Sequence, residues 1–124
     1  EKYAWIKKLN KTGDEDRLKF FEGNLNDDGS YAKAIEGCTY VLHVASPFVM
    51  SIKDPKKDLV DPAVNGTLNV LKSCQDSGVK HVVITSSMAA TTDSPNGVIT
   101  EEDWNTTSSL SRNPYYYSKV LAER

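Results

Sequence analysis

Two stretches typical of strands, separated by a long helical pattern, most constrain the fold of this chain. Residues 40–45 (YVLHVA) are nearly all apolar and residues 79–85 (VKHVVIT) contain three valines and an isoleucine, and we expect both to be strands buried on both faces of a parallel sheet. Between them, residues 58–77 form the longest helical pattern, with Pro62 in the first turns and Gly78 at the end. This alternation predicts an α/β fold with a parallel sheet and helices on both faces.

The other segments extend the alternation towards both ends of the chain, with three more helices and one more strand. Glycine, asparagine and proline residues separate these segments and indicate turns and caps, including a cap at Ser30. The order becomes helix, strand, helix, strand, helix, strand, helix, without a linker that would divide it. The expected elements are a helix over 1–9, a strand over 18–21, a helix over 31–35, a polar loop over 88–113 and a last helix from Tyr115 that Asn113 caps.

Composition excludes several classes of function. Fifteen basic residues against seventeen acidic ones give a net charge of −2, so the chain lacks the positive field that nucleic-acid binding requires. No apolar run reaches the roughly 18 residues of a membrane span. The two cysteines, Cys38 and Cys74, are too few for a disulfide scaffold, and we expect them to be reduced. We therefore expect a cytoplasmic protein that binds neither nucleic acid nor a membrane.

The predicted sheet indicates where a ligand would bind. In parallel α/β sheets, ligands lie beyond the carboxyl ends of the strands. Three places satisfy that rule here: residues 23–25, 45–47 and 86–87. The rule locates the site and leaves the ligand open.

The last helix carries the most specific chemical pattern. Tyr115 and Lys119 are four residues apart, so both side chains project from one face of the helix. An ammonium held near a phenol favours the phenolate, and such a tyrosine can exchange a proton with a substrate oxygen. Tyr3 and Lys7 have the same spacing, so the pattern acquires meaning only from its position after a strand that ends in serines.

The remaining polar residues favour structural roles when taken alone. Ser86 and Ser87 end a predicted strand, but neither lies in a G-x-S-x-G sequence, which argues against a hydrolase. His43 and His81 lie in or beside strands and are interpreted as core or sheet-edge residues. The histidines and cysteines lack the spacing of metal ligands, and we expect no metal.

Taken together, four segments resemble the extended short-chain dehydrogenase/reductases, in the branch of plant dihydroflavonol reductase and cinnamoyl-CoA reductase. The resemblance covers nearly the whole chain, and its motifs follow the order of the family. The segments are FFEGNLNDDGSYAKAIEGCTYVLHVASP (20–47), KDPKKDLVDPAVNGTLNVLKSC (53–74), VVITSSMAA (82–90) and YYYSKVLAER (115–124).

The resemblance implies that the protein reduces a small-molecule carbonyl with NADPH. Tyr115 would protonate the substrate oxygen, Lys119 would hold the nicotinamide ribose, and Ser87 would bind the carbonyl. A hydroxyl donor and an acid at the point of charge build-up stabilise the transition state more than the substrate. The resemblance places at the cofactor Asn24, Leu25, Val44, Ala45, Ser46, Thr85, Ser86, Tyr115 and Lys119.

The chain departs from the family in what it contains. The glycine-rich turn G-x-x-G-x-x-G is absent, and the family usually has Asp where this chain has Asn24. In the strand order 3-2-1-4-5-6, the chain would supply strands 3, 4 and 5 of a Rossmann-like, doubly wound sheet. We therefore expect residues 1–124 to be a partial NAD(P)-binding domain of a longer protein without the C-terminal substrate domain, and to be unstable and inactive alone.

The substrate and the oligomeric state are less constrained. Cinnamoyl-CoA reductases carry N-W-Y-C-Y-G-K before the catalytic lysine, whereas residues 113–119 are NPYYYSK, which favours a ketone or aldehyde of dihydroflavonol or aryl-aldehyde type. We expect substrate contacts from residues 47–51 and 88–113, and a monomer or homodimer. The alternatives are a cinnamoyl-CoA reductase, a hydroxysteroid dehydrogenase, a nucleotide-sugar epimerase or a non-catalytic dinucleotide-binding scaffold. The stretches HVASP and SKVLAER favour the reductase branch.

Overall fold

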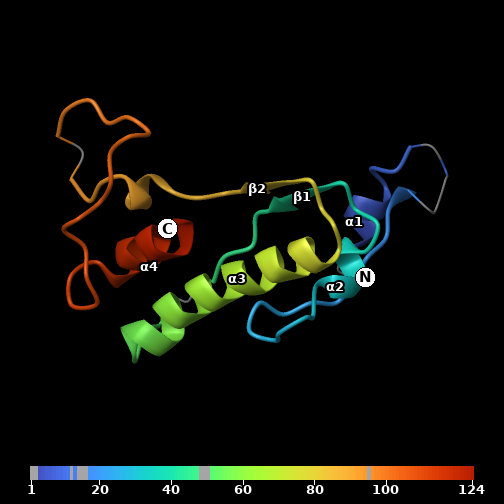
Figure 1. The fold of residues 1–124 in the computed structure, drawn as a ribbon, viewed down its shortest axis with the longest axis horizontal. Helices are drawn as coiled ribbons and strands as arrows, with labels where there is room; N and C mark the ends of the chain where they lie inside the picture. The colour runs from blue at the N-terminus through green and yellow to red at the C-terminus, as the bar shows by residue number, and fades with distance from the viewer. Residues whose placement is uncertain (1–2, 12, 14–16, 48–50, 95) are drawn as a thin grey trace.

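The computed structural model describes residues 3–11, 13, 17–47, 51–94 and 96–124. Its sheet consists of two parallel strands, β1 (Tyr40–His43) and β2 (His81–Ile84), which pair along their whole length. The N–H of Thr85 donates to the carbonyl of His43 at 2.9 Å, so the pairing continues one residue beyond β2. The carboxyl ends of both strands point towards the last helix, α4 (Pro114–Glu123) (Figure 1).

The crossover between the strands begins earlier than its apolar pattern predicts. Asp54 accepts hydrogen bonds from the N–H groups of the next turn, and Asp58 accepts from the N–H of Asp54, as in a capping box. A short π-helix, η2 (Lys56–Val60), follows and leads into α3 (Asp61–Asp76). Because Pro62 has no N–H to donate to the carbonyl of Asp58, the regular α-helical hydrogen bond is lost there, which accounts for the wider turn.

The end of α3 is a Schellman motif. Gly78 has a φ of 70°, a left-handed conformation that costs glycine little. The N–H of Val79 donates to the carbonyl of Cys74 at 3.0 Å, and that of Gly78 to Gln75 at 3.2 Å. The prediction that Gly78 ends this helix is confirmed.

The core lies between α3, the strands and a short helix, α2 (Ala32–Ile35). Ile35, Val70 and Cys74 are buried at its centre. Half-buried side chains from the loop before α2, from both strands and from the turn before β2 complete it, namely Leu25, Tyr31, Val41, Val79 and Val82. Cys38 and Cys74 are free thiols, and burial raises the pKa of Cys74.

The prediction that both strands are buried on both faces is wrong for this chain. Leu42 is 71% exposed and Val83 is 60% exposed, whereas their neighbours Val41 and Val82 pack into the core. Side chains alternate between the two faces of a strand, so one face meets α3 while the other has no covering layer among the described residues. An apolar sequence predicts that a strand needs to be buried, but it does not show whether a second layer is present to cover it.

The predicted strand over residues 18–21 does not form. These residues have no regular secondary structure and join neither β1 nor β2 in a ladder, and a strand exists only where a neighbour accepts its hydrogen bonds. Two of the three predicted strands are therefore present. The first helix, α1 (Ala4–Lys7), and a 3₁₀ turn, η3 (Met88–Ala90), complete the fold. No helix within the described ranges is long and apolar enough to cross a membrane.

Candidate active site

Helix α4 presents Tyr115 and Lys119 on one face. The helix begins at Pro114, whose fixed φ suits a first helical position. Asn113 has a φ of 52° and makes no side-chain cap, contrary to the prediction, but its carbonyl accepts from the N–H of Tyr117 at 3.0 Å. One turn along, the Lys119 Nζ lies 5.5 Å from the centroid of the Tyr115 ring. The two side chains are therefore neighbours, as their spacing on the helix predicts.

Lys119 is buried and links α4 to the sheet. Its side chain lies beneath the protein surface with 8% of the residue exposed, and its Nζ donates to the Ser46 Oγ at 2.6 Å. Burial lowers the pKa of Lys119 because the charged form loses hydration. Ser46 follows β1, so this hydrogen bond holds the helix at the carboxyl end of that strand. The resemblance placed both residues at the cofactor but did not predict their contact.

A small cavity of about 20 Å³ lies where α4 meets the strand ends. It collects residues that follow both strands, together with side chains from α3 and α4. Four of the predicted cofactor residues, Ala45, Ser46, Thr85 and Ser86, border it beside Lys119. This is the place at which the rule for parallel strands predicts a ligand.

His43 lies under the same cavity and is 6% exposed. Its burial lowers its pKa, and the positive charge of Lys119 lowers it further, so the neutral imidazole is favoured. The interpretation of His43 as a core residue agrees with this burial. His81 is exposed and stacks on Tyr40 with ring centroids 5.5 Å apart. In the part of the chain that the structure describes, no three His, Cys, Asp or Glu residues group to hold a metal ion.

The two serines after β2 have different partners. The Ser86 hydroxyl donates to the Glu123 carboxylate at the end of α4, a contact that sequence patterns did not indicate. The Ser87 Oγ accepts from the N–H of Ala89 at 3.2 Å and thereby caps η3, which packs against α4. Ser87 is half-buried and lies outside the residues that border the small cavity.

Asn24 and Leu25 lie on a loop that rests on α3, and neither borders the small cavity. The Asn24 side chain donates to Asp27 at 3.1 Å, and its backbone exchanges hydrogen bonds with the Ser30 hydroxyl. Ser30 therefore closes this loop instead of capping α2, which corrects the prediction. Leu25 packs closely on α3: a Cβ added at Gly66 would lie 2.9 Å from the Cβ of Leu25.

Val44 and the expected substrate segment are the remaining parts of the predicted site. Val44 is 66% exposed and does not border the cavity. Of the expected substrate segment 47–51, residues 48–50 lie outside the described residues.

Asn69 of α3 holds the loop that carries Asn24 and Leu25. Its Nδ2 donates to the carbonyls of Asp27 at 2.7 Å and Leu25 at 3.3 Å, and its Oδ1 accepts from the N–H of Gly29 at 2.9 Å. The residue is 6% exposed. One side chain therefore satisfies three backbone groups of the loop.

We expect Asn69→Ala to lower the free energy of unfolding of the full-length protein by about 1–3 kcal/mol, because buried backbone groups lose their partners. Urea denaturation measures this change. Asn65→Ala, an exposed position one turn earlier on α3, is the matched control and should change stability by less than about 0.5 kcal/mol. Equal effects of the two variants would contradict the role of Asn69.

The burial of His43 predicts a pH dependence of stability. Because its pKa is lowered in the folded state, the unfolded chain binds a proton near pH 6.5 that the folded chain does not. The free energy of unfolding should therefore fall as the pH decreases below about 6.5. His43→Gln should flatten this dependence in urea titrations of the full-length protein, and the exposed His81→Gln should not. A dependence that His43→Gln leaves unchanged would assign it to another group.

The geometry defines a class of protein. A parallel sheet has a helix at its carboxyl edge that presents a tyrosine and a buried lysine. A solved structure with a similar fold is that of Gre2 of Candida albicans in complex with NADPH, which superposes with a TM-score of 0.70 at 36% identity over 81% of this chain and 34% of that one. This similarity confirms the predicted α/β, Rossmann-like fold class.

The family model of the 3-beta hydroxysteroid dehydrogenase/isomerase family matches residues 2–124, and the chain belongs to that family of extended short-chain dehydrogenase/reductases. It is 40% identical to an anthocyanidin reductase of Arabidopsis thaliana over all of this chain and 38% of the relative. It is 42% identical to a cinnamoyl-CoA reductase of Medicago truncatula over 90% of this chain and 36% of the relative. The chain thus spans little more than a third of these relatives, and the predicted resemblance to the reductase branch is confirmed.

Proposed function

We propose that the protein containing this chain is an oxidoreductase that uses NADPH to reduce a ketone or aldehyde to an alcohol. The observation that carries the proposal is Lys119, a buried ammonium that contacts the Tyr115 ring and the Ser46 hydroxyl at the carboxyl edge of the sheet. Burying a charged amine is costly unless it has partners. The position of the buried Lys119 at the carboxyl edge of the sheet, where ligands bind in such folds, therefore favours a catalytic or ligand-binding role over a packing role.

The donors at this edge fit NADPH. The Lys119 ammonium and the Ser46 hydroxyl are hydrogen-bond donors suited to sugar hydroxyls, and they would hold the nicotinamide ribose. The loop at Asn24 and Leu25 is held to α3 by Asn69 and would take the adenine. When bound, NADPH supplies the hydride that reduces the carbonyl carbon.

The chain's own residues would manage the charge on the substrate oxygen. Tyr115 gives its phenolic proton to that oxygen as negative charge develops there, and Lys119 stabilises the phenolate that remains. The Ser87 oxygen already accepts from Ala89, and its hydroxyl proton donates to the same substrate oxygen. Hydride and proton together convert the carbonyl into an alcohol.

We propose a dihydroflavonol or an aryl aldehyde as the substrate type, because residues 113–119 differ from the N-W-Y-C-Y-G-K sequence at Pro114, Tyr116 and Ser118. The free thiols of Cys38 and Cys74 support a cytoplasmic location. A monomer or homodimer remains our proposal for the assembly.

Turnover of the full-length protein tests the function. NADPH consumption would be followed with a dihydroflavonol, an aryl aldehyde and a hydroxycinnamoyl-CoA thioester, and the alcohol product would be identified by mass spectrometry. We expect consumption with the first two types and little with the thioester. NADPH binding without consumption of any carbonyl would indicate a dinucleotide-binding scaffold and overturn the proposal.

A further inference from the structure

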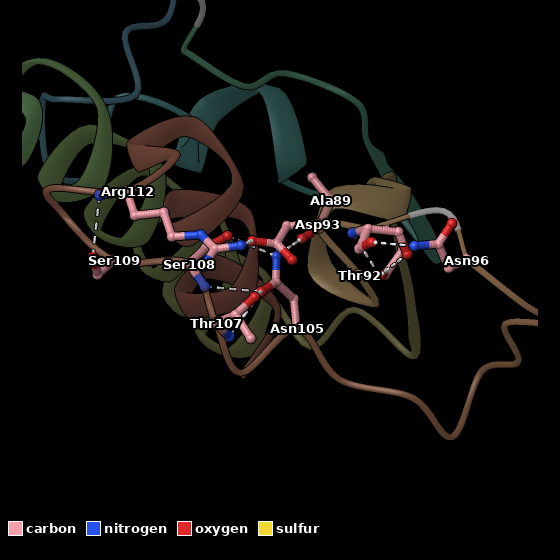
Figure 2. A network of polar contacts seen from close by, with 10 residues as sticks. Ala89, Thr92, Asp93, Asn96, Asn105, Thr107, Ser108, Ser109 and Arg112 are labelled. Atoms are coloured by element: carbon pink, nitrogen blue, oxygen red, sulfur yellow. Dashed lines mark hydrogen bonds and ion pairs between the residues drawn. The ribbon is translucent and has the colours of Figure 1, made fainter.

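The long polar loop between η3 and α4 is held by a network of polar side chains, in which the side chains of Asn105 and Asp93 are buried. Figure 2 shows this network, in which Asn105 lies at the centre and an ion pair joins Asp93 to Arg112. The loop begins at Thr91, directly after η3 and shortly beyond Ser87, and ends at Asn113, next to the helix that carries Tyr115. It therefore connects the two side chains that the proposed reaction places on one substrate oxygen.

Asn105 ties the loop to η3. It is 5% exposed, its Nδ2 donates to the carbonyl of Ala89 at 2.8 Å, and its N–H donates to the carbonyl of Ala90 at 2.9 Å. The N–H of the same Ala89 donates to the Ser87 Oγ at 3.2 Å. Ala89 thus accepts a hydrogen bond from Asn105 at its carbonyl and donates one to Ser87 from its N–H.

The Asn105 amide is fully occupied on its other side. Its Nδ2 also donates to the Ser108 Oγ at 2.9 Å, and its Oδ1 accepts from the N–H groups of Ser108 at 3.1 Å and Thr107 at 3.2 Å. These contacts fold the loop back on itself immediately before the segment that leads into α4. An amide that bridges two backbone segments and is satisfied at both ends is a rigid connection.

The ion pair joins Asp93, near the start of the loop, to Arg112, near its end. The Arg112 Nη2 lies 3.1 Å from the Asp93 Oδ2, and the Asp93 side chain is 5% exposed. Hydrogen bonding from Thr107 lowers the pKa of Asp93, and the charge of Arg112 lowers it further, so the carboxylate stays ionised. Arg112 is also held by Ser109, whose Oγ accepts from its N–H at 3.1 Å. Tyr115 follows only three residues later.

We propose that Asn105 is a positioning residue which, together with the Asp93–Arg112 ion pair, sets the position of Ser87 relative to Tyr115. Ser87 follows β2 and Tyr115 lies in α4, so the relative placement of the two hydroxyls depends on the loop that joins these elements. This inference rests on the proposed reductase function. A displacement of about 1 Å in a reacting group costs on the order of 10² in rate, which is the scale of effect expected from loosening the loop.

The test uses the full-length protein and separates positioning from folding. Asn105→Asp keeps the shape and the Oδ1 acceptor but replaces the Nδ2 donor with an oxygen that faces the Ala89 carbonyl. Asp93→Asn removes the charge of the ion pair and is the second variant, for the case in which Asn105→Asp folds poorly. NADPH-binding sites would be titrated by fluorescence, and kcat would be expressed per titrated site.

We expect kcat per site to fall about 10- to 100-fold in Asn105→Asp and by a smaller factor in Asp93→Asn, while the NADPH Kd changes less than twofold. The matched control is Gln75→Ala, which removes an exposed amide side chain near the end of α3 that does not border the small cavity. It should leave both quantities unchanged. A loss of titrated sites with unchanged kcat per site would show a purely structural role and overturn the inference. Absence of turnover in the unmodified protein would instead overturn the proposed function.

Discussion

Replacing Tyr115 by phenylalanine is expected to lower turnover by about 10² or more while leaving NADPH affinity unchanged. The change removes one oxygen, so the ring keeps its contact with the Lys119 Nζ, which lies 5.5 Å from the ring centroid. What is lost is the proton that the substrate oxygen requires as its charge develops. Steady-state kinetics of the full-length protein and fluorescence titration of NADPH measure the two quantities separately.

Its neighbours provide matched controls for this prediction. Tyr116 and Tyr117 have Val120 and Leu121 four residues on, where Tyr115 has Lys119. Tyr116 is 38% exposed and meets Tyr115 edge-on, with ring centroids 6.1 Å apart. Tyr116→Phe and Tyr117→Phe should therefore keep most of the turnover. If Tyr115→Phe matched them, Tyr115 would not be the proton donor.

Replacing Lys119 by methionine is expected to reduce kcat/KM by about 10² or more and, unlike Tyr115→Phe, to weaken NADPH binding as well. Methionine fills similar space with an apolar chain, so the loss reports the ammonium rather than a cavity. That ammonium bonds Ser46 at 2.6 Å and, in the proposed reaction, would stabilise the phenolate of Tyr115 and hold the ribose. Measuring both Kd for NADPH and kcat on one variant shows both losses.

A stability measurement must accompany the Lys119 variant. Lys119 is 8% exposed, and its burial lowers its pKa, so removing its charge also removes an unfavourable desolvation. We therefore expect Lys119→Met to unfold at a urea concentration no lower than that of the unmodified protein. Lys72→Met, at an exposed position of α3, controls for the loss of a positive charge. Full turnover in Lys119→Met would overturn the assignment of this lysine.

Much of the local structure follows from short stretches of sequence. Gly78 ends α3 because its left-handed φ of 70° is accessible to glycine at little cost. Pro114 begins α4 because the proline ring fixes φ near the helical value. The spacing of Tyr115 and Lys119 places both on one face of that helix whatever surrounds it. Such features depend on residues within a turn or two, and they were predictable.

Apart from the missing side-chain cap at Asn113, the errors concern features that need a partner outside the segment itself. Residues 18–21 have the composition of a strand but no neighbour to pair with, and Leu42 and Val83 are apolar but exposed. Ser30 was expected to cap a helix and instead holds Asn24. Propensity describes what a segment does when a partner is present, and it does not reveal whether that partner exists.

By itself, the sequence determined the family, the order of the helices and the two strands that form, and the tyrosine–lysine pair, because each of these is written in neighbouring residues or in motifs in a set order. Only the tertiary structure decided that Lys119 bonds Ser46 across 73 positions, that Asn69 holds the loop at Leu25, and that Asn105 joins η3 to the approach of α4. Hydrogen bonds of this kind depend on two segments meeting in space, and no local preference of either segment encodes the meeting.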